Sequence, residues 1–72
     1  MSPDEIRELR RRRGWTHEEL GASVYASEIS AIRWEAGATQ PRPNVEKRLL
    51  ELLQASRLRD ARMAARKIRR KA

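Results

Sequence analysis

The side chains best suited to recognition chemistry in this 72-residue sequence are Glu28, Ile29, Ile32 and Arg33. The carboxylate accepts hydrogen bonds, the guanidinium donates them, and the two isoleucines offer apolar contact. At helical spacing Ala31 and Trp34 face inward, which leaves the other four side chains exposed. An exposed isoleucine pair between an acid and a base is unusual on an ordinary surface helix. The pattern indicates a helix that contacts a partner.

Catalysis finds little support in the sequence. There is one histidine and no cysteine, and we find neither a glycine-rich phosphate loop nor a cluster spaced for metal ligation. The acidic pairs Asp4-Glu5 and Glu18-Glu19 fall in expected first helical turns, where capping and the helix dipole account for them. We therefore expect no enzymatic activity, no cofactor, no metal site and no small-molecule effector.

Two short helices joined by a tight corner must position the exposed residues. Thr16 and Glu19 form a capping box, so the first helix should begin at His17. Ser27 can cap the second helix, and Gly37 is the expected residue just past its end.

This stretch resembles the helix-turn-helix of the phage-repressor and Cro-type family of bacterial DNA-binding proteins. The resemblance rests on T-H-E-E-L at 16–20, for the family's Thr/Ser-Gln-x-x-Leu opening, and on R-W-E-A-G at 33–37, for its Arg-x-Glu-x-Gly close. No insertion or deletion separates the two blocks, and the similarity covers roughly residues 3–55. The sequence departs from the family at Gly21, where an alanine is expected, at Tyr25, where the corner usually has glycine, and at Ala31, where a branched residue is expected. A tyrosine at positive φ would cost about 1 kcal/mol.

The resemblance implies an all-α, compact four- to five-helix bundle whose second motif helix enters the major groove of double-stranded DNA. The residues it assigns to DNA are His17, Ser27, Glu28, Ile29, Ile32, Arg33 and Arg42. It also assigns an ion pair between Arg10 and Glu35. For His17 a phosphate contact and an ordinary surface position remain equally open, and for Glu28 so do a base contact and a favourable place at a helix start.

Flanking segments complete the expected bundle. Ser2 and Pro3 open a first helix that Gly14 ends. Asn44 is expected to cap a last helix, after a loop whose prolines forbid regular helix. Its core positions are Val45, Leu49, Leu52 and Leu53.

The charge is unevenly distributed. Residues 1–56 carry nine basic and nine acidic side chains, whereas residues 57–72 carry eight basic and one acidic, so the whole net charge of +7 lies in the last segment. We expect a DNA-binding domain over 1–56 and a basic extension over 57–72, either helical or frayed. Its non-specific phosphate contacts would be Arg57, Arg59, Arg62, Arg66, Lys67, Arg69, Arg70 and Lys71.

These observations predict a sequence-specific transcriptional regulator, a repressor or autoregulator. It would act in the cytoplasm of a bacterial or phage-infected cell, with no membrane association. We expect a homodimer on an inverted repeat, paired along a stripe of Leu49, Leu53, Leu58, Ala61, Ala65 and Ile68. Two alternatives remain: a module that binds a protein such as RNA polymerase through Ile29 and Ile32, and an RNA-binding protein that uses the basic tail.

Overall fold

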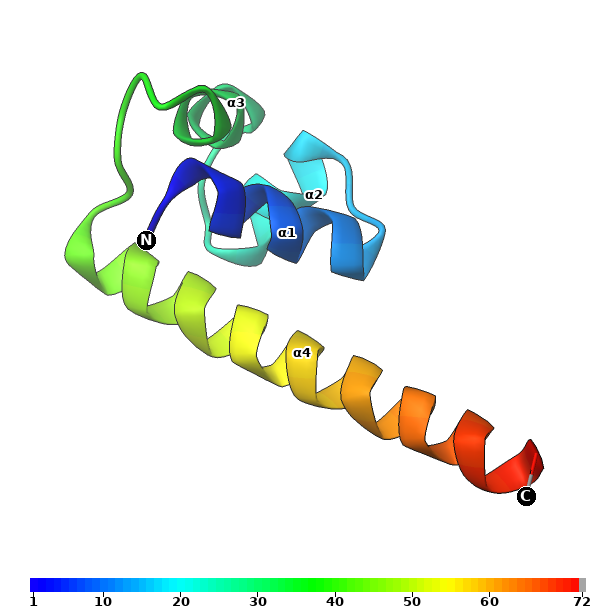
Figure 1. Ribbon diagram of the computed structural model, residues 1–72. Helices are drawn as coiled ribbons and strands as arrows, with labels where there is room; N and C mark the ends of the chain where they lie inside the picture. Colours follow the sequence, from blue (N-terminus) through cyan, green and yellow to red (C-terminus); the bar gives the residue numbers. More distant parts are fainter. Residues whose placement is uncertain (72) are drawn as a thin grey trace.

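The computed structural model describes residues 1–71, with side chains described through Arg66. The helices of this region are α1 (Pro3–Arg13), α2 (His17–Ser23), α3 (Glu28–Ala36) and α4 (Pro43–Lys71) (Figure 1). The all-α prediction is confirmed.

The expected helix boundaries are confirmed at both motif helices and at α1. Ser2 and Thr16 each form a capping box, with Glu5 and Glu19 as the reciprocal partners. The hydroxyl of Ser27 accepts a hydrogen bond from the backbone N–H of Ser30 at 3.1 Å. Local rules acting over four residues therefore set where these helices begin. Gly14 and Gly37, at φ +66° and +75°, end α1 and α3 in the left-handed conformation that glycine adopts without strain.

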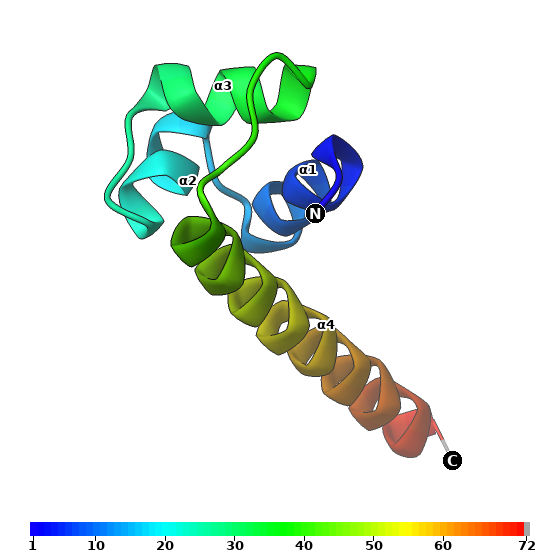
Figure 2. The same cartoon turned by 90° about the vertical axis from the view of Figure 1, so that its left-hand side faces the viewer.

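α1 lies between the other elements. It packs against α3 and against α4, while α2 packs against α3. Both views place α3 and the C-terminal end of α4 on opposite sides of the molecule (Figures 1 and 2). The shared core consists of Ile6, Leu9, Leu20, Val24, Ala31, Trp34, Leu49 and Leu53. The C-terminal half of α4 extends beyond this core as a single helix.

The start of α4 differs from the prediction. The helix begins at Pro43, and the backbone N–H of Glu46 donates to the carbonyl of Arg42 at 2.8 Å. Asn44 thus lies inside the first turn and is not the cap, so that prediction was wrong. The reason is that a proline at the first helical position needs no N–H partner and already has a helical φ. Of the two structures left open for residues 57–72, the structure has the helix, through Lys71.

The expected dimer stripe is wrong in its first two members. Leu49 and Leu53 are fully buried beneath α1, so no second copy can reach them. Leu58, Ala61 and Ala65 are exposed, whereas the side chain of Ile68 lies outside the described residues. Within the described part of the chain, none of the helices combines the length and apolar character that crossing a bilayer requires.

Candidate nucleic-acid interface

The corner between α2 and α3 is built directly on Gly21. A Cβ at this position would lie 2.6 Å from the carbonyl oxygen of Ser27 and 2.9 Å from its carbonyl carbon, closer than real Cβ contacts. The carbonyl of Gly21 accepts a hydrogen bond from the N–H of Ala26 at 2.8 Å. Gly21 therefore permits an approach that an alanine, the residue expected here from the resemblance, would obstruct.

Tyr25 forms the corner itself. Its φ is +58°, the only positive value at a non-glycine residue in the described chain. The positive φ expected at this position is thus confirmed, with its steric cost. Its side chain is fully exposed. Burial of the ring does not offset the backbone strain.

α3 leaves one of its sides exposed to solvent. Ala31, Trp34 and Glu35 are buried toward the core, whereas Ile29 and Ile32 are 60% and 44% exposed. Glu28 and Arg33 are also exposed. The four side chains expected to read bases thus lie on the solvent side of α3.

The charged groups of Glu28 and Arg33 are unpaired within the described residues. The salt bridges of the described residues involve neither Glu28 nor Arg33, so both are available to a ligand. Ser27, also exposed, is used differently, because its hydroxyl caps α3 and lies 3.0 Å from the hydroxyl of Ser30.

Glu35 anchors the concealed side of α3 to the other helices. Arg10 binds its carboxylate in a bidentate pair, with Nε 2.7 Å from Oε2 and Nη2 3.1 Å from Oε1. Arg7 Nε lies 3.4 Å from Oε1, and its Nη2 donates to the backbone carbonyl of Glu35 at 3.3 Å. Nε2 of His17 lies 3.2 Å from Oε2. One carboxylate therefore joins α1, α2 and α3.

Burial of Glu35 would raise its pKa, but the hydrogen bonds and charges of Arg10, His17 and Arg7 outweigh burial, and the net pKa is lowered. The sequence reasoning did not include Arg7, although it lies three residues before Arg10 and so on the same helical face. His17, expected at a phosphate, points its Nε2 at Glu35 and is about one third exposed. The Glu35 cluster (Arg7, Arg10, His17 and Glu35) thus fixes the orientation of α3.

The remaining DNA-assigned residue, Arg42, is exposed just before α4. The basic extension is positioned separately. Arg57 donates two hydrogen bonds to Glu8, at 2.7 and 2.9 Å. Arg12 bridges Glu8 and Asp60, at 2.7 and 2.6 Å. Hydrogen bonds from Arg57 and Arg12 lower the pKa of Glu8 to about 2.

This arrangement directs the extension away from the surface of α3. We call residues 57–71 the C-terminal arm; it leaves α1 on the side opposite α3 (Figures 1 and 2). Arg57 is engaged with Glu8, and Arg59, Arg62 and Arg66 are exposed along the arm. The structure does not bring these four side chains to the solvent side of α3. The side chains of Lys67, Arg69, Arg70 and Lys71 lie outside the described residues.

The comparison with known families agrees with this geometry. A family model described as a helix-turn-helix domain matches residues 4–65, which extend from α1 into the arm. No curated protein matches the chain significantly, and neither does any solved structure.

Proposed function

Because the chain belongs to the helix-turn-helix domain family, whose members are DNA-binding regulators, we propose that it reads a specific duplex sequence with α3 in the major groove. The observation that carries this proposal is the solvent side of α3, where Glu28, Ile29, Ile32 and Arg33 are exposed together. The Glu35 cluster supports it, because a reading helix must be held rigidly by elements that do not enter the groove.

Each exposed side chain has a base edge that it suits. Glu28 accepts a hydrogen bond from the N4 amino group of cytosine, and Arg33 donates to guanine O6 and N7 or to a phosphate. Ile29 and Ile32 contact thymine methyl groups. Ser27 and Arg42 lie at element boundaries and contribute phosphate contacts, with His17 available only if it leaves Glu35.

The test is operator binding by Glu28→Ala and Arg33→Ala variants, where the operator is the best duplex selected from a random pool. Each loss of a base contact should weaken operator binding by about 1–3 kcal/mol and relax preference at one base pair. Binding to random duplex should change far less. Arg11→Gln, an exposed cation on α1, is the matched control. Wild-type operator affinity in both folded alanine variants would overturn the groove assignment. Preferential binding to a competing RNA would indicate that the protein recognises RNA instead.

The isoleucines allow a second test at the level of single methyl groups. Replacing one operator thymine by deoxyuridine removes only the C5-methyl group, so a position contacted by Ile29 or Ile32 should lose affinity by about 1 kcal/mol. The Ile29→Ala or Ile32→Ala variant should no longer distinguish the two bases at that position. If neither variant changes the response to deoxyuridine at any position, the apolar contacts lie elsewhere.

The regulatory outcome we propose is repression or autoregulation, since a small domain seated on DNA excludes other proteins from it. Acting on DNA, it would work in the cytoplasm of a bacterial or phage-infected cell. Two copies would occupy an inverted repeat, with half-sites one helical turn apart. Sedimentation of the operator complex checks this number: a single 8.4 kDa copy per operator, at saturation, would contradict it.

A further inference from the structure

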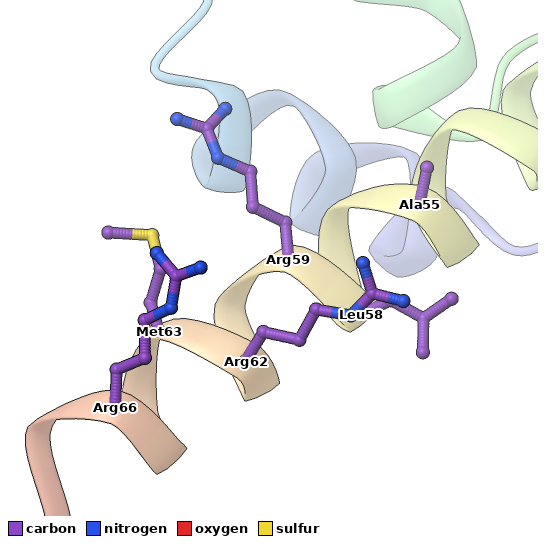
Figure 3. A pocket seen from close by; sticks show the side chains of 6 residues that line it. All are labelled: Ala55, Leu58, Arg59, Arg62, Met63 and Arg66. Carbon is purple, nitrogen blue, oxygen red and sulfur yellow. The ribbon is translucent and has the colours of Figure 1, made fainter. Parts of the chain in front are cut away.

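The C-terminal arm carries a groove that recognition by α3 does not use. The groove has a volume of about 540 Å³ and is lined by Ala55, Leu58, Arg59, Arg62, Met63 and Arg66. Its two large apolar side chains are well exposed, Leu58 at 59% and Met63 at 50%. Figure 3 shows Arg62 and Arg66 running back along the helix, Arg62 toward Leu58 and Arg66 toward Met63. Apolar surface and guanidinium groups therefore alternate along one face.

The position of the groove separates it from DNA held by α3. α1 lies between α3 and α4, and the solvent side of α3 faces away from α1. The molecule is elongated, with extents of 46 × 21 × 19 Å. Both views show the arm directed away from α3 (Figures 1 and 2). A duplex read by α3 would thus contact the molecule away from the arm that carries this groove.

The charge of the groove calls for an anionic occupant. The salt bridges of the described residues include none to Arg59, Arg62 or Arg66. Asp60, the nearest acid on the arm, is held by Arg12 at 2.6 Å. From residue 61 to 72 the sequence has six basic and no acidic residues. A second copy seated here would place arginines against arginines, which is unfavourable.

We propose that this face of the arm binds an acidic amphipathic helix of a partner protein. The lining residues recur at helical spacing, so they form one continuous stripe that a second helix can follow. Apolar side chains of the partner would cover Leu58 and Met63, while its carboxylates would pair with the arginines, whose planar forks suit carboxylates. A phosphate backbone would satisfy the arginines but leave both apolar side chains uncovered. This inference goes beyond the proposed function and does not depend on it.

The experiment uses the whole 72-residue chain and a fluorescently labelled synthetic peptide helix, with leucines along one face and glutamates flanking them. The peptide should bind at 150 mM salt, and a scrambled peptide of the same composition should bind much more weakly. The Arg62→Gln/Arg66→Gln variant should lose about fivefold in affinity, as expected for two exposed ion pairs. The Leu58→Ala/Met63→Ala variant should lose about tenfold, and alanine preserves the helix. Arg11→Gln/Lys47→Gln, which removes two exposed charges elsewhere, is the matched control.

The same variants test duplex DNA as the occupant. If Arg62 and Arg66 contacted phosphates, their removal would reduce the slope of log affinity against log salt for duplex DNA by about 2. An unchanged slope together with lost peptide binding is the result we expect. Equal binding of the ordered and scrambled peptides, no effect of the Leu58→Ala/Met63→Ala variant, or a reduced DNA slope would each overturn the proposal.

Discussion

At the scale of single residues, the corner of the motif shows what the sequence could and could not reveal. The positive φ of Tyr25 was predictable, because a corner of this type requires it whatever residue is present. The necessity of Gly21 was not. Helix propensity alone makes glycine a weak choice inside α2, and only the 2.6 Å approach of the Ser27 carbonyl explains it. Such a contact depends on the crossing of two helices, which no local pattern encodes.

Gly21→Ala should therefore destabilise the protein although alanine is the better helix former. The propensity gain is about 1 kcal/mol, but a new Cβ against backbone atoms forces α2 and α3 apart at a cost of about 1–3 kcal/mol. Urea unfolding followed by circular dichroism gives the difference in free energy.

The matched control for that substitution is Ala22→Gly, at the exposed neighbouring position of α2. At that exposed position only helix propensity changes, so the free energy of unfolding of the variant should fall by up to about 1 kcal/mol. A Gly21→Ala protein more stable than wild type would show that the corner relaxes easily and that the close approach is unimportant.

At the scale of elements, the caps of α1, α2 and α3 were predicted correctly because they depend on neighbours within one turn, whereas Asn44 lies inside α4 and does not cap it. The partners of Glu35 needed the assembled structure. Arg7 and His17 join the expected Arg10 pair only because α1, α2 and α3 converge on one carboxylate. For the same reason the periodicity of α4 did not show which apolar positions a partner could reach. Leu49 and Leu58 belong to one repeating pattern, but α1 covers only the first.

Acid should weaken the attachment of α3 through Glu35. The folded pKa of Glu35 lies below its ordinary value of 4.5, so the folded state binds fewer protons than the unfolded state in this range. Its stabilisation is therefore complete above pH 4.5 and is lost as the pH falls through the folded pKa. The stabilisation contributed by Glu8 depends on pH in the same direction, and its loss continues down to about pH 2. Urea unfolding at constant ionic strength from pH 7 to pH 2 should show this decline.

The variant Glu35→Gln isolates the contribution of the Glu35 cluster. At neutral pH it should lose about 3 kcal/mol, because the guanidinium of Arg10 is left without its carboxylate partner in a largely buried position. Its stability should also fall less steeply below pH 4.5 than that of wild type. Glu51→Gln, which disturbs only an exposed pair with Arg48, should stay within about 0.5 kcal/mol. Parallel pH curves for wild type and Glu35→Gln would remove Glu35 from the acid response.

At the scale of the whole molecule, the two proposed binding surfaces differ in chemistry and lie on separate elements, α3 and the C-terminal arm. The excess positive charge could be located from the sequence, and so could the helix that exposes Ile29 and Ile32. Their relative orientation could not, because it depends on which face of α1 each helix covers. The ion pairs Arg57–Glu8 and Arg12–Asp60 then hold the arm in that direction. The segment predicted to contact phosphates thus extends as a helix away from α3, and its role at the operator stays a prediction.

If this separation holds, the operator and the acidic peptide helix should bind at the same time and almost independently. Reciprocal titrations by fluorescence anisotropy measure the factor by which each ligand changes the affinity of the other, and the two factors must agree. At 150 mM salt the screening length is about 8 Å, so charges on opposite sides of α1 interact weakly. We expect a coupling factor below about 2. At 10 mM salt the acidic peptide should weaken DNA binding more noticeably, since the screening length rises to about 30 Å.

Unrelated duplex DNA serves as the control for these titrations, because it reports electrostatic coupling without base reading. Its response to the peptide should match that of the operator at every salt concentration. Mutually exclusive binding at 150 mM salt would mean that DNA reaches the arm. Arg59, Arg62 and Arg66 would then contact phosphates, as the sequence predicted. We expect independent binding in the wild type. Peptide affinity should be lost only in the arm variants, and operator affinity only in Glu28→Ala and Arg33→Ala. These results together would identify a protein that connects a DNA site to an acidic partner through one continuous helix.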